Sequence, residues 1–218
     1  MSRIIESEIK CACCGEEVSI DRILSYSYEN IGLSGNKHSA MQYFMEECPN
    51  CHYTSLDIED ESVRVTKGML NGFRMKPGTE NITDEKFISI LKAAYIYEKN
   101  KDYLRYEYVL RLASFYAEDL NEMSLSKSFL RQANEAAEKY IGEKEELNIS
   151  DLRLGIKIVD GNRRLGQLAT AKNMCNEILN LIEDLNDSEI DEIRLILKFE
   201  NTLLDNRDIT EHYIKEVF

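Results

Sequence analysis

Two pairs of cysteines near the start of the chain are the residues with the clearest chemistry. Cys11 and Cys14 form one C-x-x-C pair, and Cys48 and Cys51 form a second. Each pair places two thiols on one tight turn, and two such turns supply the four sulfur ligands of a tetrahedral zinc site. The sequence therefore predicts that these four cysteines bind one Zn²⁺ ion.

The predicted zinc site is structural, because four thiolates leave no coordination position open for a substrate or a water molecule. A small ribbon has little apolar surface to bury, so metal binding would supply much of its folding free energy. The 33 residues between Cys14 and Cys48 exceed the usual spacing of about 15–20. The segment between the two pairs must therefore be long.

Two neighbouring residues leave alternatives open. Cys13 could replace Cys14 as a ligand, sit beside the metal as an oxidisable thiol, or be a spare residue of the turn. His52 could join or replace a ligand, or act as a general base, although the chain has only three histidines. The run from Cys48 to His52 also satisfies the c-type haem signature. That interpretation needs an axial ligand and leaves the first cysteine pair unexplained.

No catalytic residues are predicted. The chain contains no nucleophile elbow, no phosphate-binding glycine loop and no metalloprotease motif. The acidic run that includes Asp57, Glu59, Asp60 and Glu61 is interpreted as a solvated face. Cys175 lies at a core spacing in a helix and is interpreted as packing. We therefore expect a protein that is not an enzyme.

Short strands must position the two cysteine pairs. Strands are predicted at Glu8–Lys10, Glu17–Ile20 and Met41–Met45, with a glycine-containing loop at Asn30–Lys37. This order of strand, cysteine turn, strand, loop, strand and cysteine turn is typical of a zinc ribbon. We place the ribbon at residues 1–61.

Residues 62–218 are predicted to be helical throughout, in an array of about six to eight antiparallel helices. The first helix is expected to start near Glu61 and to end at Lys76–Thr79. The second is expected to start with a hydroxyl cap at Thr83. Apolar residues then recur at three- and four-residue steps. The later helices are predicted at about 106–117, 125–140, 150–165, 168–185, 188–204 and 209–217.

Two segments resemble tetratricopeptide (TPR) repeats, which are helix–turn–helix units of about 34 residues. Leu112, Ala113 and Tyr116 fit the large–small–aromatic packing pattern of a first helix. The segment Arg164–Ala171 fits the turn and the start of a second helix, with Gly166 permitting the tight turn. The second unit departs from the pattern at two core positions, so a plain helical bundle remains the alternative.

The combined pattern resembles a bacterial family of unknown function, domain-of-unknown-function family 2225. The resemblance is carried by Lys10–Gly15, Phe44–Tyr53, Leu110–Tyr116 and Arg163–Leu168. It implies a zinc ribbon followed by TPR-like helices and implies no activity. Two family positions differ, because Ala12 replaces a proline and His52 replaces a glycine. The glycine position favours a left-handed backbone, which His tolerates at a cost.

Composition limits the partners. The net charge of −13, to which a tetrathiolate zinc site would add about two negative charges, disfavours nucleic acid, since phosphate binding depends on cationic side chains. No signal peptide or membrane span is evident, so we expect a cytoplasmic protein. The leading hypothesis is a non-enzymatic adaptor that holds a protein or peptide in a helical groove. A redox or metal sensor that uses Cys13 is the first alternative, and a nucleic-acid-binding ribbon is the second.

Overall fold

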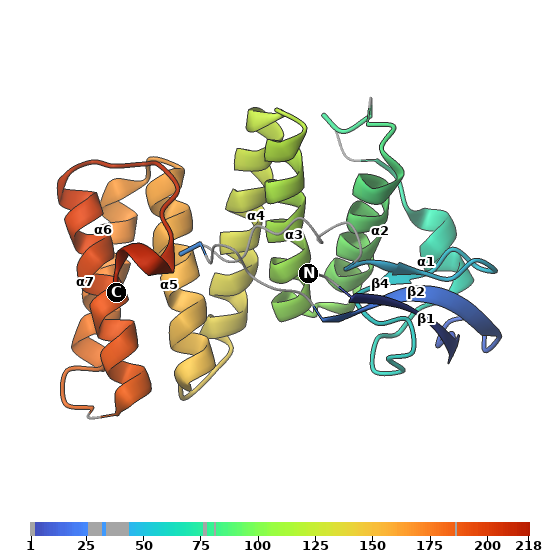
Figure 1. Cartoon of the computed structure of the whole chain (residues 1–218), viewed down its shortest axis with the longest axis horizontal. Coiled ribbons are helices and arrows are strands. Elements are labelled where there is room, and N and C mark those ends of the chain that lie inside the picture. The colour runs from blue at the N-terminus through green and yellow to red at the C-terminus, as the bar shows by residue number, and fades with distance from the viewer. Residues whose placement is uncertain (1–2, 26–31, 34–43, 76–77, 81, 186) are drawn as a thin grey trace. The chain divides into compact units, whose positions relative to one another are not determined.

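The structure is a computed structural model that describes residues 3–25, 32–33, 44–75, 78–80, 82–185 and 187–218. In these residues the chain is mainly helical, with a small antiparallel sheet near the N-terminus (Figure 1). The predicted class, mainly α with a small N-terminal β element, is confirmed at this level. The TPR-like arrangement stays a prediction.

Two short hairpins form the N-terminal part of the fold. Strand β1 (Arg3–Lys10) pairs with β2 (Glu17–Ser25), and Ile9 and Val18 are buried opposite each other. Strands β3 (Glu46–Glu47) and β4 (Thr54–Ser55) form the second antiparallel pair.

The two strands predicted around the first cysteine pair are confirmed, and both are longer than expected. The predicted loop Asn30–Lys37 lies outside the described residues except for Gly32 and Leu33. Residues 41–43 of the strand predicted at Met41–Met45 also lie outside them. Phe44 and Met45 are described and are not in a strand, and β3 begins at Glu46.

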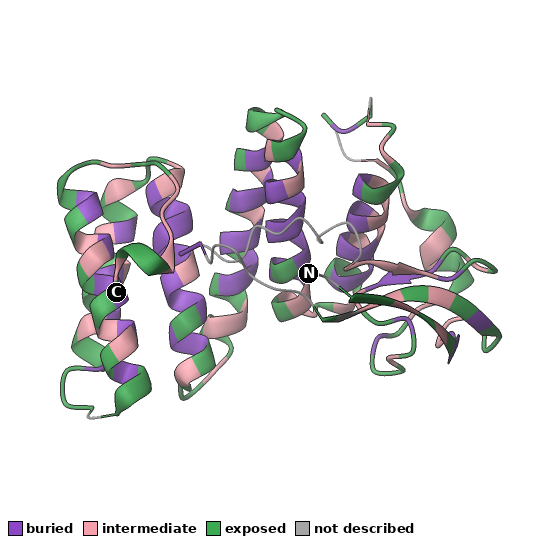
Figure 2. Ribbon diagram, in the orientation of Figure 1, coloured by how far each residue is buried: buried purple, intermediate pink, exposed green. Residues whose placement is uncertain are grey.

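Seven α-helices occur in the described residues. They are α1 (Lys67–Gly72), α2 (Glu85–Asn100), α3 (Tyr103–Asp119), α4 (Met123–Gly142), α5 (Ile149–Arg164), α6 (Leu168–Leu181) and α7 (Ser188–Asp205). Buried residues recur along the longer helices α2 to α7 (Figure 2), as the three- and four-residue apolar spacing requires. None of the described helices has the length and apolar character needed to cross a membrane.

Several predicted helix boundaries are wrong. Helix α1 ends at Gly72 rather than at Lys76, and α6 ends at Leu181 rather than near Leu185. The first helix starts at Lys67, where the Thr66 hydroxyl caps it, and not near Glu61. The carboxylate of Asp84, rather than the hydroxyl of Thr83, accepts the capping hydrogen bond from the Phe87 N–H. The last predicted helix, 209–217, is reduced to a 3-10 turn at Ile214–Glu216.

A buried arginine explains why the last segment is not helical. One guanidinium nitrogen of Arg163 donates to the backbone carbonyls of Asp208 and Thr210 at 2.7 and 2.8 Å. The Asp208 carboxylate in turn accepts from the backbone N–H of Thr210. These bonds occupy the backbone groups that a helix through residue 210 would use.

The chain divides into two compact units, Met1–Tyr28 with His38–Phe129, and Glu29–Lys37 with Leu130–Phe218. The division falls within α4, and the hairpins belong to the same unit as α2 and α3. The predicted boundary between a zinc ribbon at residues 1–61 and a helical domain at residues 62–218 stays a prediction.

In the first unit, α2 carries the second hairpin. The hydroxyl of Tyr97, which is buried, lies 2.8 Å from the Ser55 hydroxyl and accepts the Leu56 N–H at 3.1 Å. Phe87 packs edge-on against Phe129 in the core beneath, with ring centroids 5.8 Å apart. These contacts fix the segment that follows the second cysteine pair on a rigid helix.

In the second unit, α5, α6 and α7 enclose one apolar core, which includes Val159, Ala171 and Cys175. The turn between α5 and α6 is the one predicted. Gly166 has a φ of +77°, in the left-handed region, and the Gln167 N–H donates to the Asn162 carbonyl at 2.8 Å. Cys175 is fully buried, as the packing interpretation expected.

Candidate metal centre

The two cysteine turns have the same backbone geometry. The N–H of Gly15 donates to the Cys11 carbonyl at 2.8 Å, and the N–H of His52 donates to the Cys48 carbonyl at 2.9 Å. Gly15 has a φ of +77° and His52 a φ of +59°. Both turns therefore close through a left-handed residue four positions after their first cysteine, as expected for position 52.

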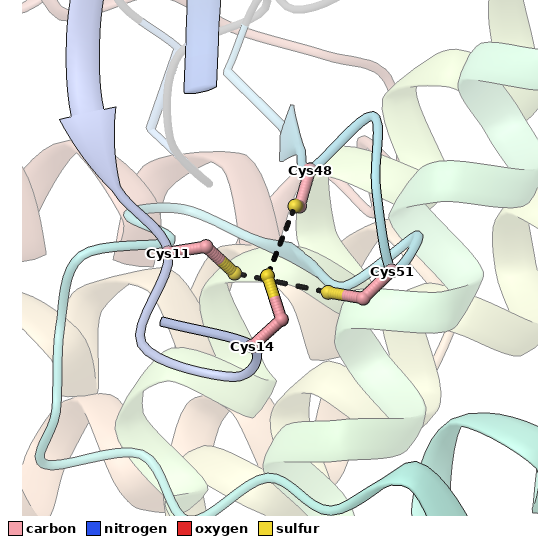
Figure 3. Close-up of side chains that lie close together, drawn as sticks. All are labelled: Cys11, Cys14, Cys48 and Cys51. Atoms are coloured by element: carbon pink, nitrogen blue, oxygen red, sulfur yellow. Dashed lines mark hydrogen bonds between the residues drawn. The ribbon is translucent and has the colours of Figure 1, made fainter. Parts of the chain in front are cut away.

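The four predicted ligands lie together. The Sγ atoms of Cys11 and Cys51 are 3.7 Å apart, and those of Cys14 and Cys48 are 3.8 Å apart (Figure 3). All four sulfur atoms lie within 4.8 Å of one another. A tetrahedron of sulfurs about 2.3 Å from a central zinc ion has edges of about 3.8 Å. The donor set and its spacing therefore form a potential metal site that is compatible with zinc.

Cys13 and His52 lie beside this group. The cluster formed by the described residues contains Cys14 and neither of these two. The Cys13 thiol is partly exposed, and burial raises its pKa although Cys51 acts in the opposite direction. The His52 ring is 70% exposed and its Nδ1 lies 3.1 Å from Glu47 Oε1.

Burial and backbone donors set the acidity of the thiols. Burial raises the pKa of Cys11 to about 11, against the backbone N–H donors of Cys14 and Cys13. Burial acts the same way on Cys48, but the N–H groups of Cys51 and Asn50 outweigh it and lower its pKa. Backbone N–H groups aimed at sulfur favour the thiolate form, which is the form that binds a metal.

Two charged clusters hold the hairpins around the centre. Arg22 of β2 binds Glu46, Asp57 and Glu59 at 2.6–2.9 Å, while Asp60 pairs with Arg105 of α3. The interpretation of this acidic run as a solvated face fits Asp57 and Glu59, whose side chains are 55% and 41% exposed although they pair with Arg22. Asp60 is less exposed, at 22%. Sequence reasoning missed Arg22, because its partners lie 24 to 37 positions away.

Glu47 forms the second cluster. It precedes Cys48, and its carboxylate accepts from the Ser89 hydroxyl at 3.0 Å and from the Lys92 ammonium at 3.5 Å, both on α2. Burial alone raises the pKa of Glu47, but Lys92, His52 and Ser89 together lower it below its usual value. The second cysteine turn is thus anchored to α2 by a charged carboxylate.

No family model matches the chain. Neither a curated protein nor a solved structure matches it. The geometry of this centre is therefore the observation on which a functional proposal can be built.

Proposed function

We propose that the chain is a zinc protein in which Cys11, Cys14, Cys48 and Cys51 bind one structural Zn²⁺. The observation that carries this proposal is the spacing of the four sulfurs, which is 3.7 Å for Cys11 and Cys51 and 3.8 Å for Cys14 and Cys48. When bound, the ion supplies folding free energy and opens no position for catalysis. The protein is accordingly not an enzyme, and its thiols suit the reducing cytoplasm.

Metal analysis of the purified full chain tests the zinc site. We expect about one zinc ion per chain, and a strong loss of zinc in Cys48→Ser. Cys175→Ala is the matched control, because Cys175 is buried in the other unit, and it should keep the zinc. A chain that contains no zinc and does not take it up under reducing conditions would contradict the proposal.

The helices carry the function in this proposal. The chain is a member of family 2225 whose TPR-like helices bind a protein or peptide partner, and not nucleic acid. The support comes from exposed apolar side chains on helices. Leu181, at the end of α6, is 62% exposed, and Leu195 of α7 is 47% exposed. A protein partner that covered these side chains would remove apolar surface from water, which is the main driving force of protein association.

A comparison of two variants tests the interaction. The full chain should capture a stoichiometric partner from a native lysate, and Leu181→Gln with Leu195→Gln should lose it. Lys127→Gln, an exposed residue of α4, is the control and should retain it. Capture that is unchanged by the leucine substitutions, or no stoichiometric partner at all, would count against the interaction while leaving the zinc proposal intact.

A redox sensor is the second candidate, favoured by the position of Cys13, a free and partly exposed thiol on the same turn as Cys11 and Cys14. A peroxide would oxidise the Cys13 thiolate to a sulfenic acid, with hydroxide leaving from the peroxide. The Cys51 thiolate would then attack that sulfur, forming a disulfide and releasing a second hydroxide. The centre would lose one thiolate ligand and release its metal.

Zinc release by dilute hydrogen peroxide tests this second candidate. We expect release from the wild-type chain, a much slower release from Cys13→Ser, and reversal by a dithiol reductant. Equal release rates from both chains would rule out Cys13 as the sensor.

A further inference from the structure

A buried charged cluster in the second unit contains two carboxylates and one cation. The Nε–H of Arg163 on α5 donates to Glu200 of α7 at 2.8 Å, and a terminal nitrogen of the same guanidinium donates to Asp160. The three side chains are at most 1% exposed. Each carboxylate also has a second buried oxygen, Oδ2 of Asp160 and Oε1 of Glu200, which has no hydrogen-bond partner among the described residues.

No other cation contacts these two carboxylates in the part of the chain that the structure describes. On α6, which packs against α7, the Cys175 thiol donates to the Leu197 carbonyl at 3.3 Å. Burial raises the pKa of Cys175 to about 12, so this thiol carries no charge at neutral pH. The other charged groups on these elements have partners of opposite charge. They are Lys172 with Asp205, and His212 with Asp208 and Glu216.

The charge balance of the cluster favours one bound proton. If both carboxylates were ionised, a net negative charge would lie out of contact with water, which is costly. Two carboxylates in one site avoid that cost by keeping a proton, because the charge of one disfavours the ionisation of the other. Burial and the Asp160 carboxylate outweigh Arg163 and raise the pKa of Glu200 to about 8.

The same guanidinium holds the chain that follows α7. Its third nitrogen donates to the backbone carbonyls of Asp208 and Thr210 at 2.7 and 2.8 Å. None of the residues 206–210 is buried. A segment with few buried contacts opens locally at a low free-energy cost. Opening of residues 206–210 is therefore the least costly way to bring water to the cluster.

We propose that Asp160 and Glu200 share one proton, and that this proton keeps residues 206–210 bound to Arg163. With the proton present, the cluster is neutral and the guanidinium stays buried under the segment. When the proton leaves to solvent, one uncompensated negative charge remains, and water reaches it when the segment opens. The second unit thus contains a pH-sensitive contact. This inference does not depend on the metal site or on the partner proposed above.

The direction of the pH effect follows from the two states of the segment. In the open segment Glu200 has the ordinary pKa of a glutamate, about 4.3, and in the closed segment its pKa is about 8. The stabilisation by the proton is fully present below the lower value and is lost as the pH rises to the higher one. Opening should become up to about tenfold more frequent per pH unit in this range.

The carboxyl carbon signal of Glu200 measures the proton directly, in the full metal-loaded chain labelled with ¹³C-glutamate. We expect a titration midpoint near pH 8, with the signal assigned by its loss in Glu200→Gln. Asp160→Asn keeps an oxygen for Arg163 and removes the second charge, so the midpoint should fall by at least about one pH unit. Glu177→Gln, at an exposed position of α6, should leave it unchanged.

Amide hydrogen exchange at Asp208, whose N–H donates to the Leu203 carbonyl at 2.9 Å, measures the opening. After correction for intrinsic rates, protection should fall between about pH 5.5 and pH 8 and then level off. In Glu200→Gln it should stay constant. Both chains are also compared with His212→Gln added, because His212 contacts Asp208. A Glu200 midpoint at the ordinary value, a midpoint unchanged in Asp160→Asn, or a parallel fall of protection in Glu200→Gln would overturn the proposal.

Discussion

At the scale of single residues, His52 adopts a left-handed backbone conformation. The equivalent position of the first cysteine turn is occupied by Gly15. Both residues close their turns with the same hydrogen bond, yet only Gly15 lacks a Cβ. A left-handed conformation costs a residue with a side chain about 1–2 kcal/mol. The contact of His52 with Glu47 is largely exposed and offsets little of that cost.

His52→Gly removes this backbone strain and should therefore stabilise the metal-loaded chain. The expected gain is only about 0.5–1 kcal/mol, because glycine loses more conformational entropy on folding than histidine does. Urea denaturation monitored by signals from the first unit measures the change. Gly15→Ala is the converse control, and we expect it to destabilise by about 1–2 kcal/mol. A lower stability in His52→Gly would mean that its side-chain contacts outweigh the backbone strain.

His212 is a second residue of interest, because its neighbours determine its protonation state. Its Nδ1 lies 2.7 Å from Glu216 and its Nε2 lies 3.0 Å from Asp208, while the Phe199 ring packs edge-on against it. A neutral imidazole has only one N–H, so two carboxylate partners favour the imidazolium. Partial burial lowers the pKa of His212, but Glu216 and Asp208 raise it further, above its usual value.

Because the folded pKa lies above the unfolded one, His212 stabilises its segment fully below about pH 6.5. The contribution is lost as the pH rises through the folded pKa. Amide hydrogen exchange at Glu216 and Val217, whose N–H groups close the 3-10 turn, measures this. After correction for intrinsic rates, protection should fall between pH 6 and pH 9. In His212→Gln it should be lower at pH 6 and vary little. Parallel pH profiles would contradict this assignment.

At the scale of elements, the periodic segments were the most predictable. The helices α3 to α7 lie close to where apolar spacing placed them, and Gly166 forms the expected turn. The ends failed where a side chain from elsewhere in the sequence decides the structure. Arg163 donates hydrogen bonds to the carbonyls of Asp208 and Thr210, which lie 45 and 47 positions further along the chain. No local sequence pattern predicts such a contact. The cysteine spacing predicted all four residues of the potential metal site, because each turn is local.

The contact between α2 and the second hairpin depends on the Tyr97 hydroxyl. Tyr97→Phe should destabilise the first unit by about 1–3 kcal/mol, because it leaves the Leu56 N–H without its partner and removes one of the hydrogen bonds of the buried Ser55 hydroxyl. Chemical denaturation followed by tyrosine fluorescence measures the loss. Tyr95→Phe, on the same helix, is the matched control and should change stability little. Equal effects of the two substitutions would show that the contact does not depend on Tyr97.

At the scale of the whole molecule, the four cysteines all lie in the first unit, and the second unit has a core of its own. We therefore expect metal binding to stabilise the first unit only. Removing the metal with a chelator should release amide protection at Cys11 and Cys48, whose N–H groups bond to Glu16 and Tyr53. Protection along α5, α6 and α7 should persist, because their core contains none of the four ligands. Hydrogen exchange read residue by residue makes this comparison, and a uniform loss would contradict it.

The burial of Tyr53 has an optical consequence. The chain contains 12 tyrosines and no tryptophan, so its near-ultraviolet absorption comes largely from phenol rings. Tyr53 follows the second cysteine turn directly and is fully buried, which raises the pKa of its hydroxyl above the usual value. In alkaline solution the metal-loaded chain should hold this phenol in its protonated form, and the stripped chain should ionise it. If the metal binds as proposed, its removal should therefore add one ionised phenol to the alkaline tyrosinate absorption band, measured as the difference between the two forms of the chain.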